Sequence, residues 1–456
     1  MKSLYFLMIS MILTLSANSQ DPVITSWLQN TTGTGSFYMQ GNPTAIDNGI
    51  LYNCQQVEYS NNFVYVTTNG IPSYPTGPFL DGNPSQAENQ SAIFRMPRFP
   101  QQNPNTPTPT NLGNIGIFIN GVALFDYRDG VGWNPSTNAL CGGPGNPPCP
   151  GGPMGSDWNR DAILAERDGF DCSKGHPAMG NYHHHQNPSA FKLDLNVISD
   201  ICNIYDADGL YAIDPNEHSP LIGYAYDGFP IYGAYGYKNN DGTGGIERIK
   251  SGYQLRNITL RTHWAGGINV PDGPPVSNNF PLGYFREDYE FVEHPGEEDY
   301  LDEHNGRFCV TPEYPMGTYA YFATVDANWN SAFPYVVGPT FYGVAQNRRV
   351  NSINEPTTVY TPTVTSISQA EFNAMDVSVF PNPASDLVAI QVGGIVNETI
   401  RVELLDITGR LVNITSINPG ATIAYFDLQT VYGGTYIIKI STESFFTSRK
   451  LVITKK

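Results

Sequence analysis

Charged residues are scarce in this chain, and the shortage is greatest for positive charge. Only 14% of the residues are charged, and 24 Lys and Arg stand against 42 Asp and Glu, which gives a formal net charge of −18. Nucleic acids and anionic membranes are bound by basic surfaces, so this balance argues against both as partners. Apart from Leu4 to Leu15, which is too short, no hydrophobic run approaches the length that spans a bilayer. We therefore expect no transmembrane segment.

Several catalytic motifs are also missing. The sequence has no G-x-S-x-G element, and its glycine-rich stretches lack the following Lys-Ser/Thr of a phosphate-binding loop. There are only six cysteines and no C-x-x-C pair, which disfavours a thiolate metal site. An even cysteine count is compatible with up to three disulfides, which form in proteins that leave the reducing cytosol. Cys141 with Cys149 would close a local loop, and Cys172 with Cys202 would bracket a histidine-rich stretch; the remaining cysteines are Cys54 and Cys309.

Residues that favour strands and turns are abundant. The 456 residues include 45 Gly, 36 Pro, 28 Tyr and 23 Phe, a composition typical of β-strands joined by long loops. The length exceeds that of one ordinary domain. We predict a mainly β protein with a large β-rich core domain over residues 20–347, a linker over 348–372, and a small immunoglobulin-like β-sandwich over 373–456.

The first 19 residues resemble a secretory signal peptide. Lys2 supplies the positive start, the apolar run follows, and Ala17 and Ser19 provide small residues before a cleavage site. We expect Gln20 to begin the mature chain. Within the core domain, residues 115–125 predict a hairpin that turns at Asn120-Gly121, and residues 157–167 predict a helix capped by Asp157.

A histidine-rich stretch, Gly175 to Pro188, holds four of the eight histidines. Because side chains alternate along a strand, His183 and His185 would share one face, about 6–7 Å apart at the backbone. His176 lies just upstream, across residues that allow the chain to turn back. Imidazole suits zinc, copper, iron and nickel. The stretch therefore predicts a transition-metal site; the alternative is a group of exposed loop histidines without a ligand.

The last 80 residues contain three short motifs and a basic end, which are Val379 to Asp386, Leu405 to Arg410, Gly434 to Ile437 and Lys450 to Lys456. In these segments the chain resembles the C-terminal sorting domain of the type IX secretion system of Bacteroidetes. The resemblance implies export across the outer membrane by the type IX machinery, followed by release or by attachment to surface lipopolysaccharide. We therefore expect a secreted or cell-surface protein.

Residues from about 115 to 343 contain a series of short motifs. They are Asn120-Gly-Val, Gly175-His-Pro, Gly180-Asn-Tyr-His-His-His, His218-Ser-Pro-Leu-Ile-Gly, Asp227-Gly-Phe-Pro-Ile-Tyr-Gly, Leu301-Asp-Glu-His-Asn-Gly and Gly317-Thr-Tyr-Ala-Tyr-Phe. In these segments the chain resembles the YHYH protein family. His184 replaces the second Tyr of the naming motif, whereas His183 and His185 are kept. The resemblance names the domain without implying a reaction. His218 and His304 lie in the matching segments and are reserve ligands, and Asp227 is a candidate ligand or base, although an Asp before Gly more often fixes a turn.

Three functions remain open from the sequence. The first is a secreted protein that binds copper or zinc through His176, His183 and His185. The second is a metal-dependent hydrolase, in which three imidazoles leave one position for an activated water. The third is a surface adhesin or carbohydrate-binding protein that stacks sugars on exposed aromatic rings, for which the candidates are Trp133, Trp158, Trp264 and Trp329; the alternative is that these rings fill a β core.

Overall fold

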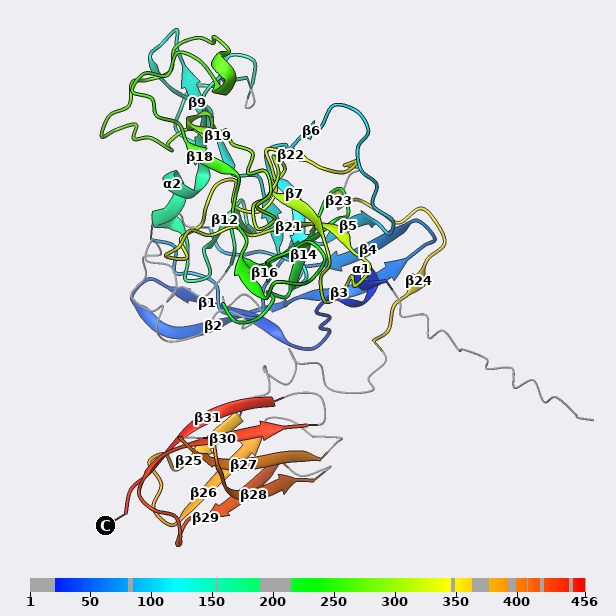
Figure 1. The fold of residues 1–456 in the computed structure, drawn as a ribbon, viewed down its shortest axis with the longest axis vertical. Coiled ribbons are helices and arrows are strands. Elements are labelled where there is room, and N and C mark those ends of the chain that lie inside the picture. The colour runs from blue at the N-terminus through cyan, green and yellow to red at the C-terminus, as the bar shows by residue number, and fades with distance from the viewer. Residues whose placement is uncertain are drawn as a thin grey trace, which may run out of the picture. The chain divides into compact units, whose positions relative to one another are not determined.

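The protein folds into two compact units, which comprise residues 1–361 and 362–456. The computed structural model describes residues 21–80, 85–152, 155–188, 215–345, 349–362, 377–392, 399–407, 409–418, 422–442 and 446–455. The expected signal peptide and Cys202 lie outside these residues. Figure 1 shows both units as strand-rich structures with long connecting loops, which confirms the predicted fold class.

An eight-stranded sheet forms the centre of the larger unit. In spatial order it contains β12 (Gly175–Ala178), β13 (Asn181–His184), β8 (Ala123–Phe125), β7 (Asn114–Phe118), β14 (Leu221–Ala225), β15 (Pro230–Tyr232), β21 (Thr318–Phe322) and β20 (Gly306–Cys309). β7 and β8 form the hairpin expected at Asn120-Gly121. All residues of β14 and β15 are buried, as expected for apolar strands that are covered on both faces.

Two glycines allow β7 and β14 to lie side by side. A Cβ atom at Gly116 would lie 2.8 Å from the carbonyl oxygen of Tyr224, and one at Gly223 would lie 2.6 Å from that of Ile117. Both separations are shorter than a normal van der Waals contact. Larger side chains would therefore push these central strands apart, which explains why the sheet needs glycine here.

A five-stranded sheet packs on the same hydrophobic core. Its spatial order is β23 (Arg349–Val350), β5 (Ala92–Pro97), β4 (Phe63–Thr68), β3 (Cys54–Tyr59) and β24 (Thr358–Val359). β5 alternates buried and half-buried side chains along its whole length, whereas β4 buries four of its six residues, three of them in succession. One core cluster joins residues of this sheet, such as Val57 and Val66, to residues of the eight-stranded sheet, such as Ile117 and Tyr321.

Smaller elements surround these sheets. One is the three-stranded sheet of β10 (Ala139–Cys141), β9 (Arg128–Asn134) and β11 (Asn159–Asp161). Four are strand pairs: β1 (Thr34–Met39) with β2 (Asn42–Leu51), β16 (Tyr235–Tyr237) with β17 (Ile246–Arg248), β18 (Tyr253–Leu255) with β19 (Tyr289–Phe291), and β22 (Thr340–Phe341) with β6 (Thr108–Pro109). The others are the short helices α1 (Pro22–Thr25) and α2 (Ala162–Glu166) and the 3-10 turns η1 (Arg167–Gly169), η4 (Ala265–Gly267) and η5 (Arg286–Asp288). None of the described helices is long and apolar enough to cross a membrane.

The helix predicted over residues 157–167 is shorter than expected. It begins at Ala162, because Asn159 to Asp161 pair with β9 as strand β11. Asp161 caps the helix in place of Asp157, and its side chain accepts hydrogen bonds from the N–H groups of Ile163 and Leu164. The predicted N-terminal boundary and cap were therefore wrong, although the helix itself is present.

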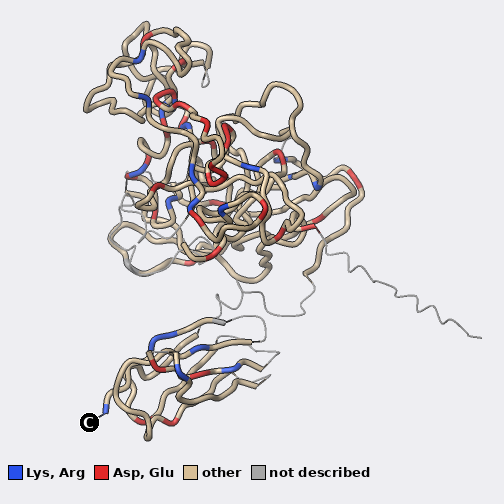
Figure 2. The backbone as a smooth tube through the Cα atoms, viewed as in Figure 1, with Lys and Arg blue, Asp and Glu red and all other residues tan. Residues whose placement is uncertain are grey.

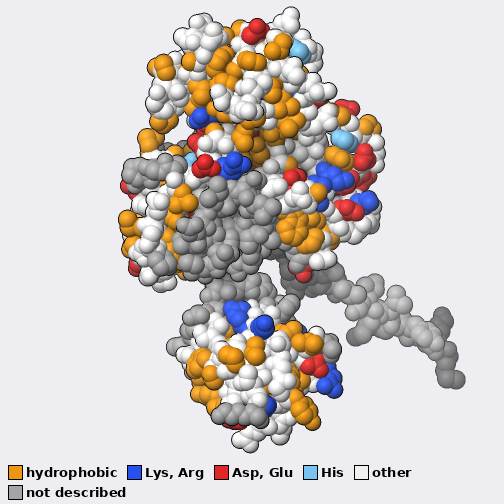
Figure 3. Space-filling view, turned by 90° about the vertical axis from the view of Figure 1, so that its left-hand side faces the viewer, with side chains coloured by type: hydrophobic (Ala, Val, Ile, Leu, Met, Phe, Trp, Pro, Cys, Tyr) orange, Lys and Arg blue, Asp and Glu red, His pale blue; other side chains and the backbone are white. Residues whose placement is uncertain are grey.

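A separate aromatic core accounts for several of the tryptophans. Trp133 and Trp158 are 7% and 0% exposed and pack with Phe285 in a small cluster. Trp264 is partly buried against the same cluster, and its ring N–H donates to the carbonyl oxygen of Asp157. These rings offer little free face to a sugar. Figure 3 shows hydrophobic side chains in scattered groups on one face of the larger unit, which is normal for a protein surface.

The smaller unit is a two-sheet sandwich. One sheet contains β25 (Val377–Phe380), β26 (Leu387–Val392) and β29 (Ile423–Asp427), and the other contains β28 (Leu411–Ile417), β27 (Ile400–Asp406), β30 (Gly434–Ser441) and β31 (Phe446–Ile453). Ile400, Val402 and Leu404 of β27 are fully buried and alternate with more exposed Arg401 and Glu403. This alternation is typical of a strand that turns one face toward the core of a sandwich.

Asp and Glu are distributed over the larger unit, with fewer Lys and Arg among them (Figure 2). Among the described cysteines, Cys141 and Cys149 form the expected local disulfide. Cys172 is also disulfide-bonded, but its expected partner Cys202 lies outside the described residues. Cys54 and Cys309 are buried and free.

Candidate metal centre

The histidine-rich stretch folds as the hairpin β12–β13 at one edge of the eight-stranded sheet. A two-residue turn, Met179-Gly180, joins the strands, and both residues have positive φ angles of 49° and 80°. Two-residue hairpin turns of this kind match the twist of the flanking strands. The resulting register places His176 directly opposite His183, so the turn brings the upstream histidine back beside the motif.

The side chains of β13 and the next residue alternate between two faces. His183 and His185 lie with His176 on one face, whereas Tyr182 and His184 contact each other on the opposite face. Burial lowers the pKa of His184 to about 3, and its Nε2 lies 2.9 Å from the hydroxyl of Tyr74. His184 is therefore a neutral, hydrogen-bonded core residue.

The backbone fixes which ring nitrogens of His183 and His185 face the cluster. The Nδ1 group of His183 donates to the carbonyl oxygen of Asn181 at 2.8 Å, and that of His185 donates to the carbonyl oxygen of Asp126. Each ring then has only Nε2 left as a ligand atom. Metal-binding histidines commonly donate their other N–H in this way, because the bond fixes the tautomer and the orientation of the ring.

The three imidazoles have the spacing of a metal site. The Nε2 atoms of His183 and His185 are 3.1 Å apart, and the ligand atoms of His176, His183 and His185 all lie within 4.8 Å of one another. Metal–nitrogen bonds of about 2.0–2.1 Å at tetrahedral angles place two ligand nitrogens about 3.3 Å apart. The His183–His185 pair is thus already at coordination distance.

Aromatic rings enclose this group. The rings of Phe125 and His183 stack with their centroids 3.7 Å apart, and Phe170 meets His176 edge-on at 4.9 Å. The three histidines are only 6%, 1% and 3% exposed. Such surroundings exclude water and strengthen electrostatic interactions within the cluster.

Glu166, the last residue of α2, adds a carboxylate that we did not predict from the sequence. Its Oε2 atom lies 3.3 Å from the Nε2 atoms of both His176 and His185. Burial opposes ionisation, but the two imidazoles hold the pKa of Glu166 well below its usual range. Within the described part of the chain, neither Glu166 Oε2 nor His176 Nε2 has a hydrogen-bond partner of acceptable geometry. Glu166 is not in the compact group of three, and no motif marks it.

Burial and charge act differently on the rings of His183 and His185. Burial lowers the pKa of His183 well below its ordinary value of 6.5, so this ring is a neutral ligand at physiological pH. Burial also acts to lower the pKa of His185, but the Glu166 carboxylate outweighs it and raises that pKa. Of these two rings, His185 is consequently the one that attracts a proton, and a cation bound at its Nε2 would have to displace that proton.

The other predicted site residues lie in separate environments. His218 Nδ1 donates to the carbonyl oxygen of Ser219 at 2.7 Å, and His304 Nδ1 lies 2.6 Å from the hydroxyl of Thr340. Among the residues whose placement is described, neither joins the group formed by His176, His183 and His185.

Asp227 is also engaged elsewhere. It is fully buried and accepts hydrogen bonds from the Tyr321 hydroxyl at 2.6 Å and the Gly343 N–H at 2.8 Å. Burial raises its pKa to about 6. These contacts join the Asp227-Gly228 turn to β21 and to the segment that follows β22.

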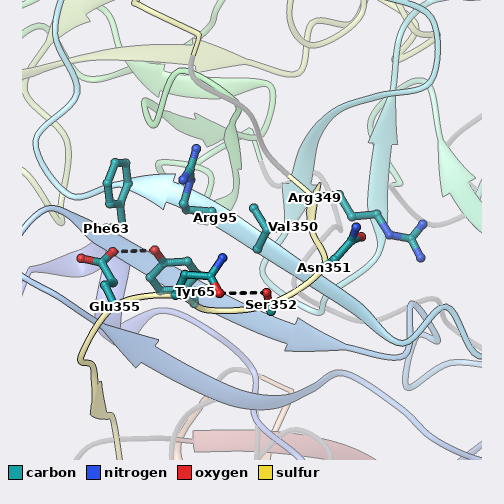
Figure 4. A pocket seen from close by; sticks show the side chains of 9 residues that line it. Phe63, Tyr65, Arg95, Arg349, Val350, Asn351, Ser352 and Glu355 are labelled. Atoms are coloured by element: carbon teal, nitrogen blue, oxygen red, sulfur yellow. Dashed lines mark hydrogen bonds between the residues drawn. The ribbon is translucent and has the colours of Figure 1, made fainter.

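A cavity of about 590 Å³ lies beside β4 and β5, away from the three histidines (Figure 4). Several of its polar side chains already have partners. Tyr65 donates to Glu355 at 2.5 Å, Arg95 lies over the ring of Phe63, and Arg349 donates to the carbonyl oxygen of Gln90. The cavity contains no histidine or cysteine, so its size alone does not make it the candidate site.

Comparison with known proteins identifies both units. The profile described as YHYH protein matches residues 93–334, which is more than half of the chain and includes β12 and β13. The chain belongs to the YHYH protein family. The profile described as secretion system C-terminal sorting domain matches residues 378–454. This YHYH protein is therefore directed to the type IX secretion machinery and is secreted or located at the cell surface.

Other comparisons add little. No curated protein matches the chain. Among solved structures, dimeric latent PorU from Porphyromonas gingivalis is 22% identical over a match that covers 18% of this chain and 9% of that chain, with a TM-score of 0.15.

Proposed function

We propose that this YHYH protein is a secreted or cell-surface protein that binds one transition-metal ion through His176, His183 and His185. The observation that carries the proposal is the facing pair of Nε2 atoms, 3.1 Å apart, on rings whose Nδ1 groups point to backbone carbonyls. Because both Nδ1 groups donate to the backbone, this close approach needs a proton or a metal ion between the two Nε2 atoms, and a metal ion would take the place of the proton that His185 attracts.

Zinc and copper fit this donor set best. Imidazole nitrogen is the preferred ligand of both, and copper binds most strongly among the divalent first-row metals. A nearby carboxylate is also common around such ions, and Glu166 occupies that place. His218, His304 and Asp227 stay in the proposal only as reserve ligands, because each has other contacts.

A metal titration of the full-length protein tests the proposal. The chain is stripped with a chelator and dialysed against zinc or copper, and bound metal is measured per chain. We expect about one equivalent for the wild type and a large loss for His183→Ala and for His185→Ala. Metal uptake by the wild type that does not exceed that of these variants would refute the proposal.

A metal-dependent hydrolase is the second candidate. Three nitrogen ligands leave a position for water, and Glu166 provides a carboxylate next to that position; these are the parts of a site that activates water. The metal-loaded protein should then hydrolyse at least one ester, phosphate or glycan substrate, and Glu166→Gln should abolish turnover. Absence of turnover across such a panel would leave metal binding alone.

Attachment to surface lipopolysaccharide is proposed from the resemblance of residues 378–454 to sorting domains. The mature protein from cells would then lack this segment and carry a mass addition at its new C-terminus. An unmodified mature C-terminus in the culture medium would show release in place of attachment.

A further inference from the structure

A second, smaller cavity of about 190 Å³ lies next to the metal centre. Phe170 forms part of its wall, and the same ring contacts His176 edge-on at 4.9 Å and lies 6.3 Å from His185. Gln186, which follows His185, and Arg167, which follows Glu166, also line the cavity. The cavity and the metal centre are therefore neighbours that share a wall.

Two hydrogen-bond donors at this cavity have no acceptor recorded among the described residues. The Nε atom of Arg167 is buried and has no hydrogen-bond partner among the described residues, and the nearest carboxylate recorded, that of Asp168, is 3.9 Å away. Gln186 is buried, with only 3% of the residue exposed. Its amide oxygen accepts from the Ser331 hydroxyl, which leaves the amide nitrogen to donate.

The rest of the wall is apolar or already satisfied. Ile163 and Leu164 of α2 contribute aliphatic surface, and Tyr289 and Tyr335 contribute aromatic rings. The Tyr335 hydroxyl donates to Asp161 at 2.7 Å, so it adds no free polar group. A ligand for this cavity must be small and mostly apolar, and it must carry an acceptor, best an anionic one, for Arg167 and Gln186.

We propose that this cavity binds a small aromatic carboxylate, whose carboxylate meets Arg167 and Gln186 and whose ring packs against Phe170 and α2. A cavity of about 150 Å³ is enough to hold a benzene ring, so about 190 Å³ suits one ring with a carboxylate. The role of such a ligand beside a metal ion rests on the proposed function, but its binding site does not require the metal.

Benzoate is a direct probe, with neutral benzamide as its match in shape. Equilibrium dialysis with the full-length protein should show one saturable benzoate site and at least tenfold weaker binding of benzamide. Arg167→Gln should lower the affinity for benzoate at least tenfold, and Arg167→Lys should restore part of that loss. Leu164→Trp, which fills the cavity, should block benzoate binding. Arg349→Gln, at the other cavity, is the control and should change affinity less than twofold.

The inference is overturned if benzoate shows no saturable binding, or if Arg167→Gln and Leu164→Trp bind it as the wild type does. Repeating the dialysis with chelator-treated protein and with His183→Ala separates this result from the metal proposal. Benzoate binding that survives both treatments but needs Arg167 supports the cavity whether or not metal binds. Metal binding without any benzoate site would refute the cavity proposal alone.

Discussion

Replacing Glu166 by Gln removes one negative charge beside two of the proposed ligands while keeping the size of the side chain. The Glu166 Oε2 atom lies 3.3 Å from the Nε2 atoms of His176 and His185. A unit negative charge on Glu166 and a unit positive charge at that distance attract by about 5 kcal/mol at an effective dielectric constant of about 20, before desolvation is counted. The cost of desolvating the two charges offsets most of this attraction. Mutation of a residue that contacts a metal ligand usually lowers metal affinity about 10- to 100-fold, which corresponds to about 1.4–2.8 kcal/mol. We expect Glu166→Gln to weaken zinc or copper binding within that range.

Competition with a chromophoric chelator at neutral pH measures this change on the full-length protein. Glu303→Gln is the matched control, because Glu303 also lies near an imidazole, 3.7 Å from His304, but outside the cluster, and is 59% exposed. The control should bind metal as the wild type does. The reasoning is refuted if Glu166→Gln binds metal within about twofold of the wild type, or if Glu303→Gln loses as much.

Three further predictions follow from the same structure. His183→Ala should lower metal affinity by more than about 100-fold, since it removes a ligand itself. His184→Gln, on the opposite face of the strand beside Tyr74, should change the affinity little in the same titration. Equal losses for the two variants would contradict the assignment of His183 and His184 to opposite faces. Metal affinity should fall as the pH drops through the raised pKa of His185, because protons then compete for Nε2; affinity that is constant across the titration, or that rises toward acid, would be inconsistent with that ligand. Leu404→Ala should lower the free energy of unfolding of the C-terminal unit by about 2–5 kcal/mol in denaturant, because it leaves a cavity in the sandwich core. Metal affinity should not change. A parallel loss of metal binding would show that the two units are coupled.

Much of the fold could be predicted because the strand patterns are strong. The alternation of Ile400, Val402 and Leu404 with polar neighbours indicates a sandwich strand directly. The Asn120-Gly121 turn between two apolar runs likewise predicts the β7–β8 hairpin. The start of α2 was less predictable, because Asn159 to Asp161 pair with β9, and a pairing with a distant strand leaves no local mark on the sequence.

In the candidate site, too, the features set by local sequence were predictable and those set by distant contacts were not. The period of a strand predicts that His183 and His185 share a face, and the Met179-Gly180 turn explains how His176 returns to them. Glu166 could not be predicted, because it reaches the cluster only through the tertiary placement of α2. The environments of His218 and His304 were equally hidden, because a sequence motif does not show which segments meet in space.

The most direct test of the central claim is a crystal structure of the metal-loaded protein with anomalous diffraction collected at the metal absorption edge. The account predicts one anomalous peak about 2.0–2.2 Å from the Nε2 atoms of His176, His183 and His185. A peak at another group of residues, a metal held through Nδ1 of these rings, or no peak after loading would contradict it.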